Sequence, residues 1–105
     1  MFVERTLHGG KPMTTIIAVH EVENGKHWAQ AWHQGAGSRH ELMAKIGVTA
    51  RTFRDPQNPN LTGLILEVPD MMKFQAFMQS DEAKKAMGED RVKPETLRML
   101  SEFTP

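Results

Sequence analysis

The stretch TTIIAVHEV, residues 14–22, is β-branched and apolar and predicts the strand around which the chain folds. The stretch LTGLILEV, residues 61–68, has the same character. In both stretches neighbouring positions are apolar, so apolar side chains point to both faces of the predicted strand. A strand of this kind belongs in the middle of a sheet, and each of its faces requires cover.

Helix signals fill the interval between these two strands. Asn24 can cap a helix through its side-chain oxygen, and this helix ends at the glycines of QGAG, residues 34–37. Ser38 and Glu41 form an S-x-x-E capping box in front of a second helical piece, which ends at Gly47. The sequence therefore predicts a first helical region that is broken in two.

Two weaker strands and a second helical region complete the chain. Residues 48–54 alternate and predict a strand, and the turn formers of residues 55–60 predict a hairpin loop after it. Asp70 begins one helical segment and Ser80 caps its continuation. Residues 95–103 predict a closing strand, with a helical turn as the alternative.

The resulting order, β-α-β-β-α-β, predicts an α+β, ferredoxin-like fold. Right-handed crossovers place both helical regions on one face of a four-stranded antiparallel sheet. This domain is expected over residues 13–105, with residues 1–12 as an N-terminal arm or extension. Because the helices can cover only one face of the central strands, a second copy of the chain is expected to cover the other.

Composition excludes several classes of protein. The chain has 105 residues, with 13 Lys and Arg against 13 Asp and Glu, so no net field attracts nucleic acid or an anionic membrane. It has no cysteine, which excludes disulfides and thiolate chemistry. No apolar run approaches the ~20 residues of a membrane span, and residues 1–12 lack the core of a signal peptide. A cytoplasmic protein is therefore expected.

The stretch VPDMMKFQAFMQSDEAKKAM, residues 68–87, leads from a strand end into a helix and then into a Ser-Asp-Glu-Ala restart. With the order of elements and the broken first helix, it makes residues 13–103 resemble the dimeric α/β-barrel superfamily, in particular antibiotic-biosynthesis-monooxygenase-like proteins. The resemblance implies two sheets that face each other in a dimer, with pockets between sheet and helices. Members include cofactor-independent monooxygenases, haem-degrading enzymes and small isomerases, so the fold leaves the activity open.

Both tryptophans lie in HWAQAWH, residues 27–33. At about 100° per residue, Trp28 and Trp32 share one stripe of a helix. His27 and His33 are six residues apart and diverge, whereas two helical histidines that share a metal are usually four apart. The stretch thus favours core tryptophans or the aromatic wall of a pocket over a metal site. The candidate ligand-binding residues are Trp28, Trp32, Phe53 and Ile65.

The strands carry the candidate catalytic groups: His20, Arg51, Glu67 and Arg98. One interpretation is an interface ion-pair network between Glu67 and an arginine. The other makes His20 a general base, since its ordinary pKa is near 6.5, with Arg51 or Arg98 orienting an anionic or enolate oxygen. Both interpretations require these side chains to converge on the face of the sheet that is turned away from the helices. The residues expected to face the helices are Ile17, Val19, Leu64, Leu66, Val68, Leu97 and Met99. The residues expected on the opposite face are Ile16, Ala18, His20, Thr49, Arg51, Phe53, Ile65, Glu67, Arg98 and Leu100.

The favoured function is a homodimer that binds an apolar or aromatic metabolite, without a metal or cofactor. Cofactor-independent monooxygenase or isomerase activity is what the resemblance implies. The main alternative is a non-catalytic, stress-related or interaction module whose pocket is filled by side chains such as Trp28, Trp32, Phe53 and Phe74. A further alternative is haem binding through a histidine.

Overall fold

The computed structural model describes residues 13–33 and 35–105, so the expected arm, residues 1–12, lies outside the described residues. The predicted order of elements is confirmed, with both helical regions divided in two. In chain order the elements are β1 (Thr14–Glu21), α1 (Gly25–Ala31), α2 (Arg39–Ala44), β2 (Thr49–Arg54), β3 (Leu61–Val68), α3 (Met71–Met78), α4 (Asp81–Glu89), the 3-10 turn η2 (Pro94–Thr96) and β4 (Arg98–Ser101).

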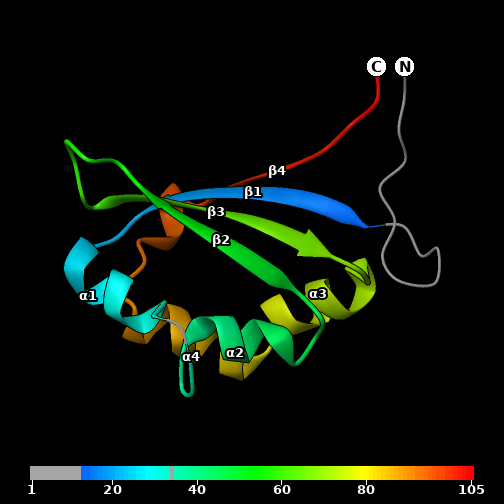
Figure 1. Ribbon diagram of the computed structural model, residues 1–105, viewed down its shortest axis with the longest axis horizontal. Coiled ribbons are helices and arrows are strands. Elements are labelled where there is room, and N and C mark those ends of the chain that lie inside the picture. The colour runs from blue at the N-terminus through cyan, green and yellow to red at the C-terminus, as the bar shows by residue number, and fades with distance from the viewer. Residues whose placement is uncertain (1–12, 34) are drawn as a thin grey trace.

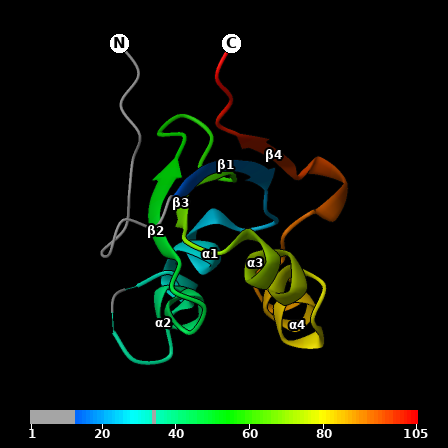
Figure 2. The same cartoon turned by 90° about the vertical axis from the view of Figure 1, so that its right-hand side faces the viewer.

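The four strands form one antiparallel sheet in the order β2-β3-β1-β4. The two strands that are apolar on both faces, β1 and β3, are therefore central, as predicted. All four helices lie beneath one face of this sheet (Figures 1 and 2). Within residues 13–33 and 35–105, no element covers the opposite face.

The helices begin at the predicted caps. The side chains of Asn24, Ser38, Asp70 and Ser80 each accept a hydrogen bond from the backbone N–H three residues later. Each cap satisfies a donor that the first turn of a helix leaves free. The region after α2 ends at Gly47, whose φ of +74° favours glycine.

The hairpin loop between β2 and β3 fixes the start of α1. Gly25 donates from its N–H to Asn60 Oδ1 at 2.8 Å, and its carbonyl accepts from Arg54 at 2.9 Å. A Cβ at position 25 would stand 1.9 Å from the Pro59 carbonyl oxygen, so only glycine fits here. This close approach holds α1 against the sheet and sets the position of Trp28.

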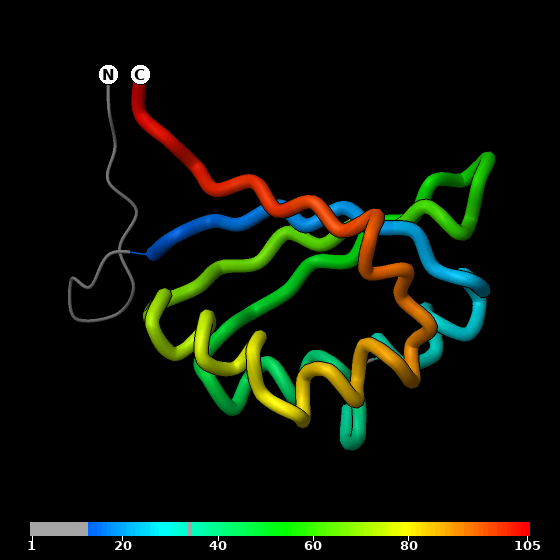
Figure 3. Tube along the Cα trace, turned by 180° about the vertical axis from the view of Figure 1, so that it is seen from behind, coloured from blue at the N-terminus to red at the C-terminus, as the bar shows by residue number. Residues whose placement is uncertain are grey.

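The last strand is shorter than predicted. The sequence predicts a strand over residues 95–103, whereas β4 spans only four residues and follows the 3-10 turn η2. The predicted strand and the alternative of a helical turn are therefore each partly right for this segment. In Figure 3 the segment after α4, drawn in orange, rises from the helix layer to the sheet, where β4 pairs with β1.

The expected orientation of β1 is wrong. Ile16, Ala18 and His20 are buried beneath the helices, whereas Ile17 and Val19 are 41% and 38% exposed on the opposite face. The expected rows of β3 are confirmed, with Leu64, Leu66 and Val68 buried under the helices. Alternation could not orient β1 because both of its rows are apolar.

Candidate functional site

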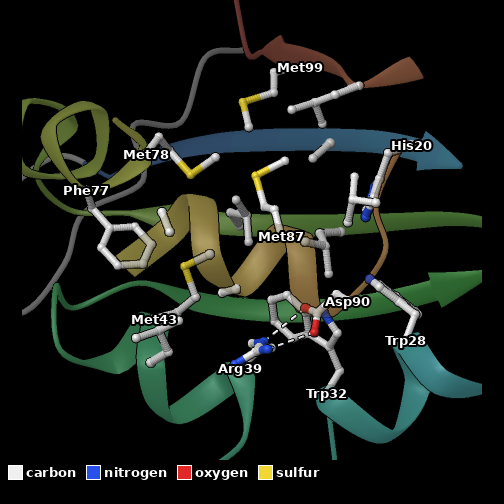
Figure 4. A pocket seen from close by; sticks show the side chains of 18 residues that line it. His20, Trp28, Trp32, Arg39, Met43, Phe77, Met78, Met87, Asp90 and Met99 are labelled. Atoms are coloured by element: carbon white, nitrogen blue, oxygen red, sulfur yellow. Dashed lines mark hydrogen bonds and ion pairs between the residues drawn. The ribbon is translucent and has the colours of Figure 1, made fainter. Parts of the chain in front are cut away.

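A cavity of about 70 Å³ lies between the helix-facing side of the sheet and the helices (Figure 4). Its wall is apolar except at His20, Arg39 and Asp90. Trp28 and Trp32 contribute aromatic surface, and four methionines contribute flexible surface. The full lining comprises Ala18, His20, Trp28, Trp32, Arg39, Leu42, Met43, Leu64, Leu66, Phe77, Met78, Ala83, Ala86, Met87, Asp90, Val92, Leu97 and Met99.

His20 is the unusual member of this wall. It lies on β1 opposite Thr62 of β3, and only 5% of its surface is exposed. Its Nδ1 has no hydrogen-bond partner among the residues that the structure describes. Its ring meets the Trp28 ring edge-on, with the ring centroids 5.8 Å apart. Because buried polar atoms are nearly always hydrogen-bonded, an unpartnered nitrogen beside a cavity marks a candidate binding site.

Burial controls the charge of this imidazole. Desolvation lowers the pKa of His20 from its ordinary value of 6.5, because the charged ring is disfavoured away from water. The carboxylate of Asp90 opposes this shift, but its effect is the smaller one. His20 is therefore neutral at pH 7, and one of its ring nitrogens can accept a proton or a hydrogen bond.

An ion pair closes the cavity wall opposite the sheet. Arg39, the first residue of α2, donates from Nε to Asp90 Oδ2 at 2.9 Å and from Nη2 to Asp90 Oδ1 at 2.8 Å. Nη2 also lies 3.2 Å from Glu89 Oε1. The hydrogen bonds to Asp90 are the main cause that raises the pKa of Arg39. The pair links the beginning of α2 to the residue after α4 (Figure 4).

The prediction that Trp28 and Trp32 share one stripe of the helix and are buried is confirmed. Trp28 and Trp32 are buried on one side of α1, with ring centroids 6.1 Å apart, and both line the cavity. The flanking histidines instead bind backbone carbonyls: His27 Nε2 lies 2.7 Å from the Glu89 oxygen, and His33 Nδ1 lies 2.6 Å from the Gln30 oxygen. Within the described ranges, no three His, Asp or Glu side chains gather in a way that could hold a metal ion.

The other predicted site residues lie on the opposite face of the sheet. Arg51 pairs in register with Ile65, and its guanidinium stands 5.4 Å from the centre of the Phe53 ring. Glu67 accepts a hydrogen bond from Thr15 at 2.7 Å, and Arg98 donates to the backbone carbonyls of two neighbouring residues. The expected convergence of these residues with His20 is therefore wrong, because the sheet lies between them.

Phe53 also borders a separate, shallow depression at the edge of β2. Trp28 and Trp32 reach this depression from the other side, and its volume is about 230 Å³. Phe53 does not line the His20 cavity, and neither does Ile65. The four predicted ligand-binding residues therefore divide between two surfaces, with only the tryptophans at the cavity.

Sequence reasoning missed Arg39 and Asp90. They are 51 positions apart, and each stands among other charged residues that lie on the surface. The one local sign is that Asp90 follows the end of a helix, where a carboxylate is unfavourable unless a cation lies nearby. That sign does not identify the partner.

Acidification is expected to destabilise the protein through His20. In the unfolded chain His20 takes up a proton near pH 6.5, but in the folded chain only at a lower pH. The unfolded state therefore binds more protons between these two values, and the free energy of unfolding falls as the pH drops below about 6.5, by up to about 1.4 kcal/mol per pH unit. Arg39 and Asp90 are the charged groups that share this cavity with His20.

Urea denaturation at a series of pH values between 5 and 8 measures this loss. The variant His20→Phe should lack the His20 component of the pH dependence, whereas His33→Phe, altered at an exposed position, should retain it. Identical pH profiles for the parent protein and His20→Phe would contradict the assignment.

The sheet order and the single helix layer define an α+β protein of the ferredoxin-like type. No protein-family model matches the sequence, and no curated protein matches it. In the part of the chain that the structure describes, no helix is long and apolar enough to cross a membrane.

Two solved structures are similar to this chain. One is described as a "putative antibiotic biosynthesis monooxygenase" from Bordetella bronchiseptica; the TM-score is 0.61, with 17% identity over 89% of this chain and 97% of the other. The second is an ethyl tert-butyl ether D (EthD) family protein from Bacillus halodurans, with a TM-score of 0.49 and 18% identity over 89% and 99% of the two chains. The first likeness confirms the expected ferredoxin-like fold.

Proposed function

We propose that this protein binds a small apolar or aromatic metabolite in the cavity between sheet and helices, where His20 contacts the polar group of the ligand. The observation that carries the proposal is the buried Nδ1 of His20, which has no partner within residues 13–33 and 35–105 and lies beside an otherwise mostly apolar wall. An unsatisfied buried polar atom destabilises a protein by about 1–3 kcal/mol. A ligand group that pairs with Nδ1 would recover this energy on binding. Small-molecule sites commonly combine apolar walls with few polar groups.

The proposed chemistry is proton transfer without a cofactor. Neutral His20 accepts a proton from the ligand, and Asp90 favours the imidazolium that forms. Return of the proton to another atom of the same molecule gives isomerisation. In the oxidative alternative, the deprotonated carbon of the ligand forms a bond to dioxygen, which is the co-substrate and the oxidant. The imidazolium of His20 returns the proton to the resulting peroxide, which loses water, so that one oxygen atom stays on the ligand as a carbonyl and the other leaves as water. Arg39 is the arginine at the cavity, but its charge is already paired with Asp90, so it does not take the orienting role expected of Arg51 or Arg98.

Native mass spectrometry of protein purified gently from its own cells tests the binding proposal. We expect extra mass on the parent protein and its loss in the variant His20→Phe. Recovery of bare protein, together with no change in the nuclear magnetic resonance (NMR) spectrum on addition of small aromatic compounds, would contradict the proposal. The chemistry is tested separately, by the rate at which the parent protein and His20→Phe convert the ligand. An unchanged rate in His20→Phe would show that His20 is not the base, but it would leave the proposal of a binding site in place.

The size of the cavity favours a second candidate, a non-catalytic interaction module. Its volume of about 70 Å³ is less than half of the roughly 150 Å³ at which an engineered apolar cavity binds benzene. Trp28 and Trp32 line this small space with their own rings. A protein that remains bare in both experiments, yet self-associates, would favour this candidate.

We propose further that the chain forms a homodimer through the open face of its sheet. Ile17, Val19, Phe53 and Leu100 are exposed on that face, and charged side chains at positions 51, 67 and 98 share it. Contiguous apolar surface rimmed by polar residues is typical of protein interfaces. The face is also the one left bare by the helices, and a second copy presents the same apolar surface.

The variant Ile17→Asp is expected to weaken this dimer at least about tenfold, because each copy would place an unpaired carboxylate in the interface. Analytical ultracentrifugation over a concentration series measures the change in dissociation constant. Met72→Asp is the matched control, since Met72 is 82% exposed on α3, in the helix layer. Equal dissociation constants for the two variants would place the interface elsewhere.

A further inference from the structure

We propose that the ligand of the His20 cavity is a compact, uncharged, single-ring molecule with one hydroxyl group, and that this hydroxyl pairs with Nδ1 of His20. This inference rests on the proposed function, because it requires the cavity to be a binding site. It goes further by naming the size, charge and polar group of the ligand. Each of these three properties follows from a different feature of the wall.

The volume of the cavity limits the size of the ligand. At about 70 Å³ the space is smaller than one that accepts benzene without rearrangement. Four methionines, Met43, Met78, Met87 and Met99, line it from α2, α3, α4 and β4 (Figure 4). Methionine side chains are unbranched and rotate easily, so they can repack around a guest. Such adjustment can admit one ring, whereas fused rings would require the backbone of the sheet or the helices to move.

The ion pair in the wall limits the charge of the ligand. Both carboxylate oxygens of Asp90 already accept from Arg39, in a two-pronged arrangement with distances of 2.8 and 2.9 Å. The two charges therefore neutralise each other before any ligand arrives. A carboxylate or an ammonium group on the ligand would lose its hydration in an apolar space with no free counter-charge. An uncharged molecule avoids this penalty.

The unpartnered nitrogen selects the polar group. A neutral imidazole has one nitrogen that donates and one that accepts, and the tautomer decides which of these is Nδ1. A hydroxyl group can both donate and accept, so it satisfies Nδ1 in either tautomer. A carbonyl can only accept and would satisfy one tautomer alone. Among the residues that the structure describes, Nδ1 of His20 is the one fully buried side-chain nitrogen or oxygen without a partner, so one hydroxyl is sufficient and a second would be buried without a partner.

The two tryptophans make this inference measurable by NMR. They are the only tryptophans in the sequence, and both line the cavity, so the two indole N–H signals report on its occupancy. The probes are p-cresol and toluene, which differ by one hydroxyl group, with benzoate as the anionic probe and 2-naphthol as the two-ring probe. The ¹⁵N shift of His20 Nδ1 in the unaltered protein reports directly on the hydrogen bond. That measurement does not depend on whether a variant folds.

The variant His20→Phe removes the nitrogen but keeps an aromatic ring. Its matched control is His40→Phe, because the His40 ring also meets a cavity tryptophan edge-on, 5.2 Å from the centre of Trp32, but His40 does not line the cavity. We expect p-cresol to bind about tenfold more tightly than toluene, the ratio that one well-formed hydrogen bond of about 1.4 kcal/mol produces. This preference should disappear in His20→Phe and remain in His40→Phe.

Three other outcomes would each overturn the inference. Equal binding of toluene and p-cresol, with no change at Nδ1, would leave the cavity as an apolar binding site and the proposed function intact, but would exclude the hydroxyl. Tighter binding of benzoate or 2-naphthol would show that the ligand is charged or larger. If no probe moves either indole signal, the proposed binding function fails together with the inference.

Discussion

Replacement of Trp28 by alanine is expected to lower the free energy of unfolding by about 3–5 kcal/mol, the usual effect of truncating a buried aromatic residue. Trp28 is 2% exposed, and its ring meets those of His20 and Trp32. The truncation would remove these contacts and enlarge a cavity that already exists beside the ring. Because small domains have total stabilities of only about 5–15 kcal/mol, this change is a large share of the whole.

Urea denaturation at one fixed protein concentration measures the effect, since self-association makes apparent stability depend on concentration. Met72→Ala provides the control, because it shortens an exposed apolar side chain and should change stability by no more than about 0.5 kcal/mol. A loss below about 1 kcal/mol in Trp28→Ala would show that this side chain does not pack as the structure describes. It would also weaken the use of Trp28 as a reporter of ligand.

The order of elements could be predicted because its signals are local. Each helix start depends on a cap that acts within three residues, as Asn24 and Ser80 do, and Gly47 ends its helix through its own backbone angle. The central position of β1 and β3 follows from apolar residues on both faces, which is also a property of the strands themselves. The structure confirms each of these predictions.

The orientation of β1 could not be taken from alternation, and this decided the candidate site. Both of its rows are apolar in the middle, and the rows differ only at the end, where Glu21 continues the row of Ile17 and Val22 that of Ile16. Val22 is fully buried and Glu21 is exposed, so this pair held the missing information. Exchanging the two rows moves every side chain of a strand to the other face, and the buried row of Ile16 and Val22 is the one that includes His20.

The ion pair in the cavity wall could not be predicted from short stretches of sequence, for a different reason. Arg39 and Asp90 meet only because α2 and α4 are brought together under the sheet. Their contact depends on the packing of the whole domain, which no short stretch of sequence records. The same is true of the missing partner of His20 Nδ1, because an unpaired atom becomes visible only when all of its neighbours are placed.

The variant Asp90→Asn is expected to lower the free energy of unfolding by about 2–4 kcal/mol, because it leaves Arg39 only the longer contact with the exposed Glu89 as a counter-charge. The side chains of Arg39 and Asp90 are 18% and 7% exposed. Because Arg39 is partly exposed, the expected loss of stability is toward the lower end of what is usual when one member of a buried ion pair is removed. Urea denaturation at pH 7.5 measures it, at the same protein concentration as for Trp28→Ala.

The double variant Arg39→Met with Asp90→Leu is the control for this interpretation. Replacing both members of a buried pair by apolar residues is often close to neutral, whereas removing one member leaves an uncompensated charge. We therefore expect the double variant to be more stable than Asp90→Asn. If the double variant is instead the less stable of the two, the loss reflects the shape of the side chains and not the ion pair.

Two single substitutions, Asp90→Asn and Arg39→Met, should move the pKa of His20 in opposite directions, which a loss of packing alone would not do. Removing the carboxylate in Asp90→Asn takes away the charge that favours the imidazolium and leaves Arg39 nearby, so the pKa of His20 should fall further below its ordinary value. Removing the guanidinium in Arg39→Met leaves the carboxylate without its partner, so the pKa of His20 should rise. NMR titration of the His20 ring measures both shifts. Shifts in the same direction would mean that Asp90 does not act on His20 through its charge, and the proposed role of Asp90 in proton transfer would fail with it.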